Sequence, residues 1–155
     1  MTLSHKDCML LAIAEAMKAK SQNEVPVGAI VMQKNQVIGR GHNSVIRDNS
    51  VAGHAELNAI NEASKTLNNY RLLNCDLYIT LEPCHMCAKA IVDARIKNVY
   101  FATLEPKTGS IVSIDNFFDK TFLNHKVNYS LGLMQEESSR LLKDFFLDLA
   151  SLKRH

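Results

Sequence analysis

The chain has 155 residues and a formal net charge of +2, which suits one domain, residues 1–155, with a single core. Its 46% hydrophobic and 22% charged residues are typical of soluble globular proteins, and the modest charge permits a polyanionic partner without requiring one. There is no apolar run of the roughly 18–20 residues that a membrane span needs, and no apolar N-terminal signal, so we expect a cytoplasmic protein without membrane contact.

The N-terminal part of the chain predicts a helix followed by a hairpin. Residues 4–20 show helical spacing of apolar side chains, with Ser4 as a candidate N-cap. The apolar positions of this pattern are Leu10, Leu11, Ile13, Ala14 and Met17. Residues 25–32 are apolar and β-branched, residues 34–35 form a polar turn, and residues 36–41 return as a second strand.

The rest of the chain alternates helices and strands. After a loop at residues 43–53, the pattern predicts helices at 54–65, 84–94 and 135–152, strands at 76–81, 98–103 and 126–130, and a loop with a short helix at 111–123. Such alternation predicts an α/β fold with a central five-stranded mixed sheet flanked by helices. No internal repeat, linker or low-complexity tract is present in the sequence, which also favours a single domain.

Two short strings carry the chemistry. They are His54-Ala55-Glu56 and Pro83-Cys84-His85-Met86-Cys87, or H-x-E and P-C-x-x-C. One imidazole and two thiolates suit Zn²⁺, which prefers four ligands in a tetrahedron, so one position remains for water. Pro83 should end a strand and favour a helix start, and Cys84 and Cys87 would then share one face of that helix. The strings predict a catalytic zinc site with His54, Cys84 and Cys87 as ligands.

The carboxylate of Glu56 follows the ligand histidine by two residues, so it can reach the zinc-bound water without being a ligand. One carboxylate can serve as base and then as acid, because the proton it gains is the proton it returns. We therefore predict Glu56 to be the catalytic residue, which takes a proton from water and passes protons to the ring nitrogen and to the departing amine.

Other interpretations of the cysteines are weaker. A lone C-x-x-C is also typical of a redox pair, and a structural zinc site could use His85 as its fourth ligand. Because His85 is adjacent to Cys84, its ring would point elsewhere on a helix, so we expect it at a pocket rim or on the surface. Cys8 and Cys75 lie among apolar residues and are expected to be small core fillers.

The two strings together resemble those of the zinc-dependent cytidine and deoxycytidylate deaminase superfamily. More narrowly, the chain is similar to the bacterial tRNA-specific adenosine deaminases over nearly its whole length. The matching strings are Glu24-Val-Pro-Val-Gly-Ala, Gly41-His-Asn43, Gly53-His-Ala-Glu, Asn69-Tyr-Arg-Leu, Tyr78-Ile-Thr-Leu-Glu-Pro-Cys, Met86-Cys-Ala, Arg95-Ile, Lys107-Thr-Gly-Ser, Leu123-Asn-His-Lys-Val and Lys143-Asp-Phe-Phe.

The resemblance implies a cytidine-deaminase-like three-layer α-β-α fold with one Zn²⁺ per subunit. It also implies a homodimeric hydrolase that converts adenosine to inosine at the wobble position of a tRNA anticodon. Apolar residues around Met86 to Val92 would suit the contact with a second subunit.

Substrate contacts follow from the same resemblance. The implied set is Pro26, Val27, Asn43, Ala55, Pro83, Lys107 and Phe146. Asn43 would hydrogen-bond the flipped base or its ribose, since an amide offers a donor and an acceptor, although an asparagine can also simply close a turn. Pro26 and Val27 would wall the base pocket, which is compatible with strand packing, and Phe146 would lie near the RNA loop unless it packs in the core.

Basic residues late in the chain could bind the anticodon stem-loop. Lys107, Lys126, Arg140 and Lys143 could form one basic surface, although such charges are more often simply solvated.

Two other functions remain open at this point. The same zinc chemistry could act on free guanine, cytosine or a nucleoside. A non-catalytic zinc module that binds nucleic acid is less favoured, because a structural site has no use for Glu56.

Overall fold

The computed structural model describes residues 2–153, and its centre is a mixed sheet with the strand order β2-β1-β3-β4-β5. The strands are β1 (Gly28–Gln33), β2 (Gln36–His42), β3 (Asp76–Leu81), β4 (Asn98–Thr103) and β5 (Asn128–Leu131). β1 pairs antiparallel with β2 and with β3, whereas β3, β4 and β5 run parallel. The predicted five-stranded mixed sheet is therefore confirmed, and β3 and β4 have the predicted bounds.

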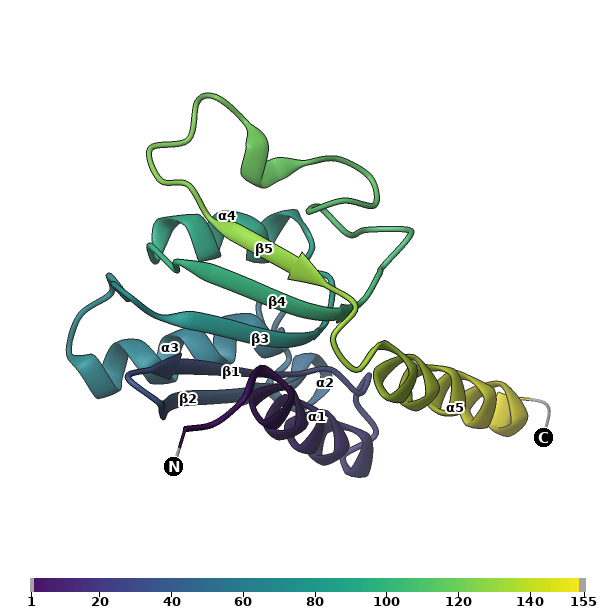
Figure 1. The fold of residues 1–155 in the computed structure, drawn as a ribbon. Coiled ribbons are helices and arrows are strands. Elements are labelled where there is room, and N and C mark those ends of the chain that lie inside the picture. The colour runs from purple at the N-terminus through teal and green to yellow at the C-terminus, as the bar shows by residue number, and fades with distance from the viewer. Residues whose placement is uncertain (1, 154–155) are drawn as a thin grey trace.

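Helices cover both faces of this sheet (Figure 1). They are α1 (His5–Ser21), α2 (Val45–Asp48), α3 (Ala55–Leu67), α4 (His85–Asp93) and α5 (Gln135–Lys153), with a 3₁₀ turn at Phe117–Asp119. Side chains alternate along β1, so Ala29 and Val31 pack with α3 and α4, whereas Ile30 and Met32 pack with α1. Two apolar layers thus enclose the sheet, which confirms the three-layer α-β-α fold.

Helix α1 begins as predicted, and only some of the apolar positions noted in the sequence face the sheet. Ser4 and Asp7 form a capping box, which fixes the helix start. The buried residues are Cys8, Met9, Ala12, Ile13, Glu15, Ala16 and Ala19, whereas the predicted apolar positions Leu10, Ala14 and Met17 are exposed. The reason is close packing: a Cβ on Gly28 would lie 2.1 Å from the carbonyl oxygen of Ala12. Small side chains therefore face Gly28, an arrangement that the spacing of apolar residues alone does not indicate.

Helix α3 is pressed on β2 in the same way. A Cβ on Gly41 would lie 2.3 Å from the carbonyl oxygen of Ala55, and a Cβ on Gly39 would lie 2.3 Å from that of Ala59. The two glycines let the backbone of α3 touch the backbone of β2. This contact fixes the height at which α3 begins above the sheet.

Several boundaries differ from the predicted ones. His54 and Cys84 are the N-caps of α3 and α4 rather than their first residues. The predicted loop at residues 43–53 contains the single-turn helix α2, which is too short to show an apolar period. β1 begins at Gly28 instead of residue 25, and β5 begins at Asn128 instead of residue 126.

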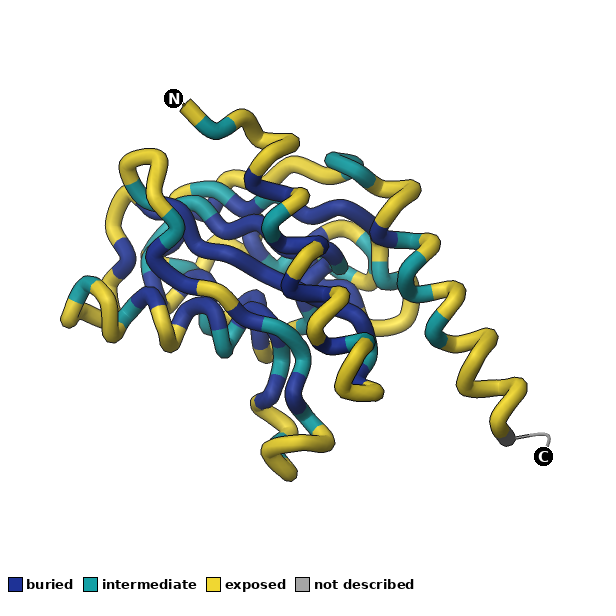
Figure 2. The backbone as a smooth tube through the Cα atoms, turned by 90° about the horizontal axis from the view of Figure 1, so that it is seen from below, coloured by how far each residue is buried: buried dark blue, intermediate teal, exposed yellow. Residues whose placement is uncertain are grey.

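Helix α5 starts against the sheet and then leaves it (Figures 1 and 2). Near its start Ser139 Oγ lies 2.8 Å from Thr103 Oγ1 at the end of β4. Further along, Phe146 is 51% exposed, so the alternative that it packs in the core is wrong. Within residues 2–153 no helix combines the length and the apolar character that crossing a bilayer would take.

Candidate metal centre and active site

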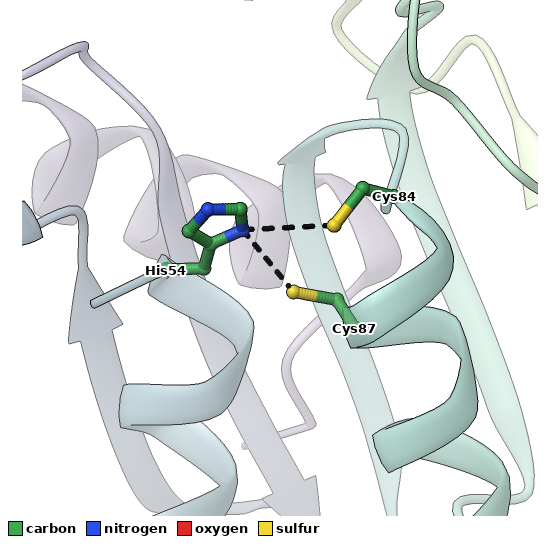
Figure 3. Close-up of side chains that lie close together, drawn as sticks. All are labelled: His54, Cys84 and Cys87. Atoms are coloured by element: carbon green, nitrogen blue, oxygen red, sulfur yellow. Dashed lines mark hydrogen bonds between the residues drawn. The ribbon is translucent and has the colours of Figure 1, made fainter. Parts of the chain in front are cut away.

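The two predicted ligand strings meet where two helices begin. His54 caps α3 directly after the 43–53 loop, and Cys84 caps α4 directly after β3. Both helix N-termini point toward the same space, with Cys87 one turn into α4 (Figure 3). The positive ends of the two helices favour thiolates at this place.

The three donor atoms have the spacing of metal ligands. His54 Nδ1 lies 3.7 Å from Cys84 Sγ and 3.4 Å from Cys87 Sγ (Figure 3). All three donors lie within 4.8 Å of one another, and they are the only such group in the described part of the chain. Bond lengths of 2.0–2.3 Å in a tetrahedron place nitrogen and sulfur ligands about 3.6 Å apart. The donors therefore fit a zinc ion with a fourth position open to water.

His85 lies away from this group. Its Nε2 atom is 2.7 Å from Asp115 Oδ2, and its side chain is 53% exposed. The geometry therefore does not support a structural zinc site with His85 as a ligand.

Protons are unevenly shared by the ligand residues. The pKa of Cys84 is lowered to about 3, chiefly because Cys87 donates a hydrogen bond to it, with His54 adding to the effect against the opposing effect of burial. The same hydrogen bond and burial raise the pKa of Cys87, and the bond to Cys84 raises the pKa of His54. These hydrogen bonds thus favour the thiolate form of Cys84, and a bound cation would replace the proton of Cys87.

Glu56 is the carboxylate of the site. It lies in the first turn of α3, its residue is only 4% exposed, and it lines the same cavity as His54 and Cys84. Burial raises its pKa to about 6. A group with this pKa can both accept and release a proton near neutral pH.

A cavity of about 390 Å³ opens above these residues. Of the predicted site residues, its wall includes Val27, Asn43, His54, Glu56, Cys84 and Phe146. Pro26, Ala55 and Pro83 are buried beside the wall without lining it, and Lys107 is exposed next to the lining residue Thr108. A volume of this size suits one nucleoside rather than a longer segment of RNA.

Asn43 uses one half of its amide inside the protein. Its Oδ1 accepts a hydrogen bond from the backbone N–H of Ala55 at 3.0 Å. The backbone group can only donate, so the oxygen must face it, and the Nδ2 donor is the half available to a ligand. Both roles expected from the sequence, shaping a turn and binding a base, are therefore compatible.

Two buried carboxylates of the cavity wall were not predicted, Glu24 and Glu82. Glu24 accepts hydrogen bonds from the backbone N–H groups of Ile46 and Arg47 at 3.1 and 2.8 Å, and thereby holds α2. Glu82 holds the loop after β4 in a similar way. Both residues stand in strings quoted above, E-V-P-V-G and L-E-P-C, but their neighbours there gave no sign of these roles.

The predicted basic surface is divided in the structure. Arg140 and Lys143 lie together on α5, near the end of β4 that precedes Lys107. Lys126 precedes β5, and because β5 runs parallel to β4 it lies at the opposite end of the sheet. Lys126 therefore cannot share a surface with Lys107, and that part of the prediction is wrong.

Comparison with known proteins shows the family of the chain. The family model described as MafB19-like deaminase matches residues 3–150. The tRNA-specific adenosine deaminase of Aquifex aeolicus is 44% identical over 139 residues, covering 90% of this chain and 91% of its own. That of Haemophilus influenzae is 42% identical, covering 89% of this chain and 80% of its own. The chain belongs to the tRNA-specific adenosine deaminases.

Solved structures show the same relationship. A structure from a study of A-to-I editing by tRNA:A34 deaminases superposes with a TM-score of 0.85 at 40% identity, covering 87% of this chain and 98% of the other. A guanine deaminase of Bacillus subtilis has a TM-score of 0.64 at 28% identity, covering 90% and 92%. The fold is thus shared with enzymes for free bases, but the likeness to the tRNA deaminases is greater.

Proposed function

We propose that this protein is a zinc-dependent hydrolase that converts adenosine to inosine at the wobble position of a tRNA anticodon. One observation carries the proposal: a buried Glu56 lies beside three converging donors, His54, Cys84 and Cys87, at the floor of a cavity of about 390 Å³. Membership of the tRNA-specific adenosine deaminases supports the choice of substrate.

His54, Cys84 and Cys87 would hold the metal. When bound there, zinc acts as a Lewis acid that lowers the pKa of a water molecule from about 15.7 to about 7. Glu56, whose pKa is already raised to about 6 by burial, would accept a proton from the water that adds to C6 of the adenine ring.

The remaining steps belong to Glu56 as well. It passes the proton it gained to the ring nitrogen next to C6. It then takes the remaining proton of the hydroxyl added at C6 and passes it to the amino group, which leaves as ammonia as the C6–N bond breaks and the C6 carbonyl forms. Adenosine and water thus give inosine and ammonia. Asn43 Nδ2 would donate to the base or its ribose, and Val27 would pack against the ring from the cavity wall.

The RNA outside the target nucleotide would meet the rim of the cavity. Phe146 lines the cavity from α5 and is half exposed, so it can stack on a base. Lys107, Arg140 and Lys143 are exposed and could contact phosphates. Because tRNA is the substrate, we place the protein in the cytoplasm.

We also propose that the protein forms a homodimer. Of the apolar residues around Met86 to Val92, Ile91 and Val92 are buried in the chain's own core and cannot face a partner. Met86, Ile114 and other large apolar side chains nevertheless remain exposed, in segments that the His85–Asp115 pair joins. Light scattering at micromolar concentration should give twice the mass of the chain, and a monomer would count against this proposal.

The deciding experiment compares substrates. Total tRNA, an anticodon stem-loop, free guanine and free cytosine are each incubated with the protein and analysed by mass spectrometry. We expect inosine at the wobble position of tRNA, none with Glu56→Ala, and full activity with Glu62→Ala, an exposed control on the same helix. Turnover of guanine or cytosine without inosine in tRNA would refute the proposal.

A further inference from the structure

Glu82, at the end of β3, is the most heavily hydrogen-bonded carboxylate among residues 2–153. Its residue is only 2% exposed. It accepts from the backbone N–H groups of Glu105, Ile111, Val112 and Ser113 at 3.1, 3.0, 2.8 and 2.9 Å, and Ser113 Oγ donates to it as well. These donors come from both ends of the segment 105–113, so one side chain closes that segment into a loop.

The fit between Glu82 and the loop is close. A Cβ on Gly109 would lie 2.3 Å from Glu82 Oε1, so only glycine leaves room for the carboxylate there. Glu82 forms no ion pair within the described residues, so peptide dipoles rather than a lysine or an arginine stabilise its charge. Burial alone would raise the pKa of Glu82, but the hydrogen bonds from Ser113, Val112 and Glu105 outweigh it and lower the pKa.

The neighbours of Glu82 bind the same loop. The carbonyl oxygen of Pro83 accepts from the N–H of Ser110 at 2.8 Å, and His85 pairs with Asp115 at 2.7 Å. Residues 82–85 therefore contain the candidate ligand Cys84 and also hold the loop by hydrogen bonds. The loop in turn brings Glu105 and Thr108 to the cavity wall and Lys107 to its rim.

We propose that Glu82 is a positioning residue for RNA binding, because it holds residues 105–113 at the cavity mouth. The inference rests on the proposed tRNA deamination and adds a residue that touches neither the proton path nor the metal. Loss of the hydrogen bonds to Glu82 should free residues 105–113 and weaken RNA binding, because the RNA outside the target nucleotide would contact this rim of the cavity. It should leave the proton transfer by Glu56 nearly intact.

Glu82→Gln tests this with almost no change of volume, because an amide replaces one acceptor oxygen by a donor that faces N–H groups. We expect hydrogen exchange at Ile111, Val112 and Ser113 to accelerate about tenfold or more, as the loss of charge-assisted hydrogen bonds would cause. The KM for an anticodon stem-loop should rise about tenfold while kcat changes less than about threefold, with zinc content unchanged.

Glu24→Gln is the matched control, since Glu24 is an equally buried carboxylate that holds backbone N–H groups of a different loop. It should accelerate exchange at Ile46 and Arg47 and leave the 111–113 amides unchanged. If Glu82→Gln does not fold, Ser113→Ala replaces it: this removes one donor to Glu82, and exchange at Ile111 and Val112 should still rise.

The outcomes separate this inference from the proposed function. Unchanged exchange at residues 111–113 in Glu82→Gln or Ser113→Ala would overturn it. So would a loss of zinc, or a loss of kcat with KM unchanged, because Glu82 would then act through the metal. The exchange measurement needs no substrate, so it tests whether Glu82 holds residues 111–113 even if the wild-type protein forms no inosine. An absence of inosine would contradict only the proposed function and the link to RNA.

Discussion

Asn43 Oδ1 accepts a hydrogen bond from the backbone N–H of Ala55 at 3.0 Å, immediately beside the candidate ligand His54. The first helical N–H groups of α3 have no partner within the helix, and His54 makes no side-chain cap of its own. Asn43 thus supplies from the cavity wall the acceptor that the N-cap residue does not. The candidate substrate residue and the candidate metal ligand are coupled through one peptide.

Asn43→Asp separates these two roles. The aspartate keeps the acceptor for Ala55 but loses the amide donor, so folding and zinc content should stay near wild type. Deamination should fall by about 10- to 100-fold if the donor contacts the base. Asn43→Ala should in addition cost about 1 kcal/mol of stability, as lost caps do. Thermal unfolding and single-turnover kinetics provide the measurements, and full activity of Asn43→Asp would show that no substrate contact uses Nδ2.

His85→Ala tests the ligand assignment. The His85–Asp115 pair is half exposed, so its loss should cost less than about 1 kcal/mol in unfolding free energy. Zinc content, measured by elemental analysis, should remain at one per chain in His85→Ala and fall sharply in Cys87→Ser. Loss of zinc from His85→Ala would mean that the metal is held differently from the geometry described above.

Tyr78 predicts a loss of stability at alkaline pH. Burial raises the pKa of its phenol in the folded state above the ordinary value of about 10. The folded protein therefore keeps the proton while the unfolded chain releases it, so this contribution is complete below about pH 10 and is lost as the pH rises further. Urea unfolding should show that the difference in unfolding free energy between the wild type and Tyr78→Phe shrinks above pH 10. A constant difference would refute the raised pKa of Tyr78.

Gly28→Ala should destabilise the protein more than an ordinary surface change. The added Cβ would lie 2.1 Å from the carbonyl oxygen of Ala12 and 2.3 Å from the backbone nitrogen of Ala16. Because both atoms belong to the backbone of α1, the helix must shift, at a cost of about 1–3 kcal/mol or more. Gly132→Ala, which has open space and a φ of +96°, isolates backbone strain alone. Chemical unfolding curves of the two variants decide whether the tight contact matters.

The sequence predicted the elements whose signals are local. β3 and β4 are short runs of aliphatic and aromatic residues, each followed by a Glu-Pro pair within three residues, and their predicted bounds were correct. The inward face of α1 could not be read from the pattern, because the close contact with Gly28 favours alanine over leucine and Gly28 is distant in sequence from Ala12. The roles of Glu24 and Glu82 depend on backbone N–H groups about 20 to 30 residues further along the chain, and no spacing of residue types encodes such hydrogen bonds.

The site followed the same rule. His54, Cys84 and Cys87 stand in dense local strings, and the structure brings their donor atoms together. The predicted basic surface joins Lys126 to Lys107 because the two are near each other in sequence. The parallel pairing of β4 and β5 instead separates them by the length of a strand. Surfaces built from several elements require the topology, which the residue pattern gave only in outline.

The glycine contact between β2 and α3 has a consequence for how such an enzyme can diverge. With no side chain between Gly41 and the first turn of α3, the depth of His54 and Glu56 does not depend on any rotamer in the core. Two parts of the wall around them, in contrast, are segments held by single carboxylates, α2 by Glu24 and residues 105–113 by Glu82. Changes in these segments can therefore alter the shape of the cavity for a new substrate, while His54 and Glu56 keep their positions relative to the sheet.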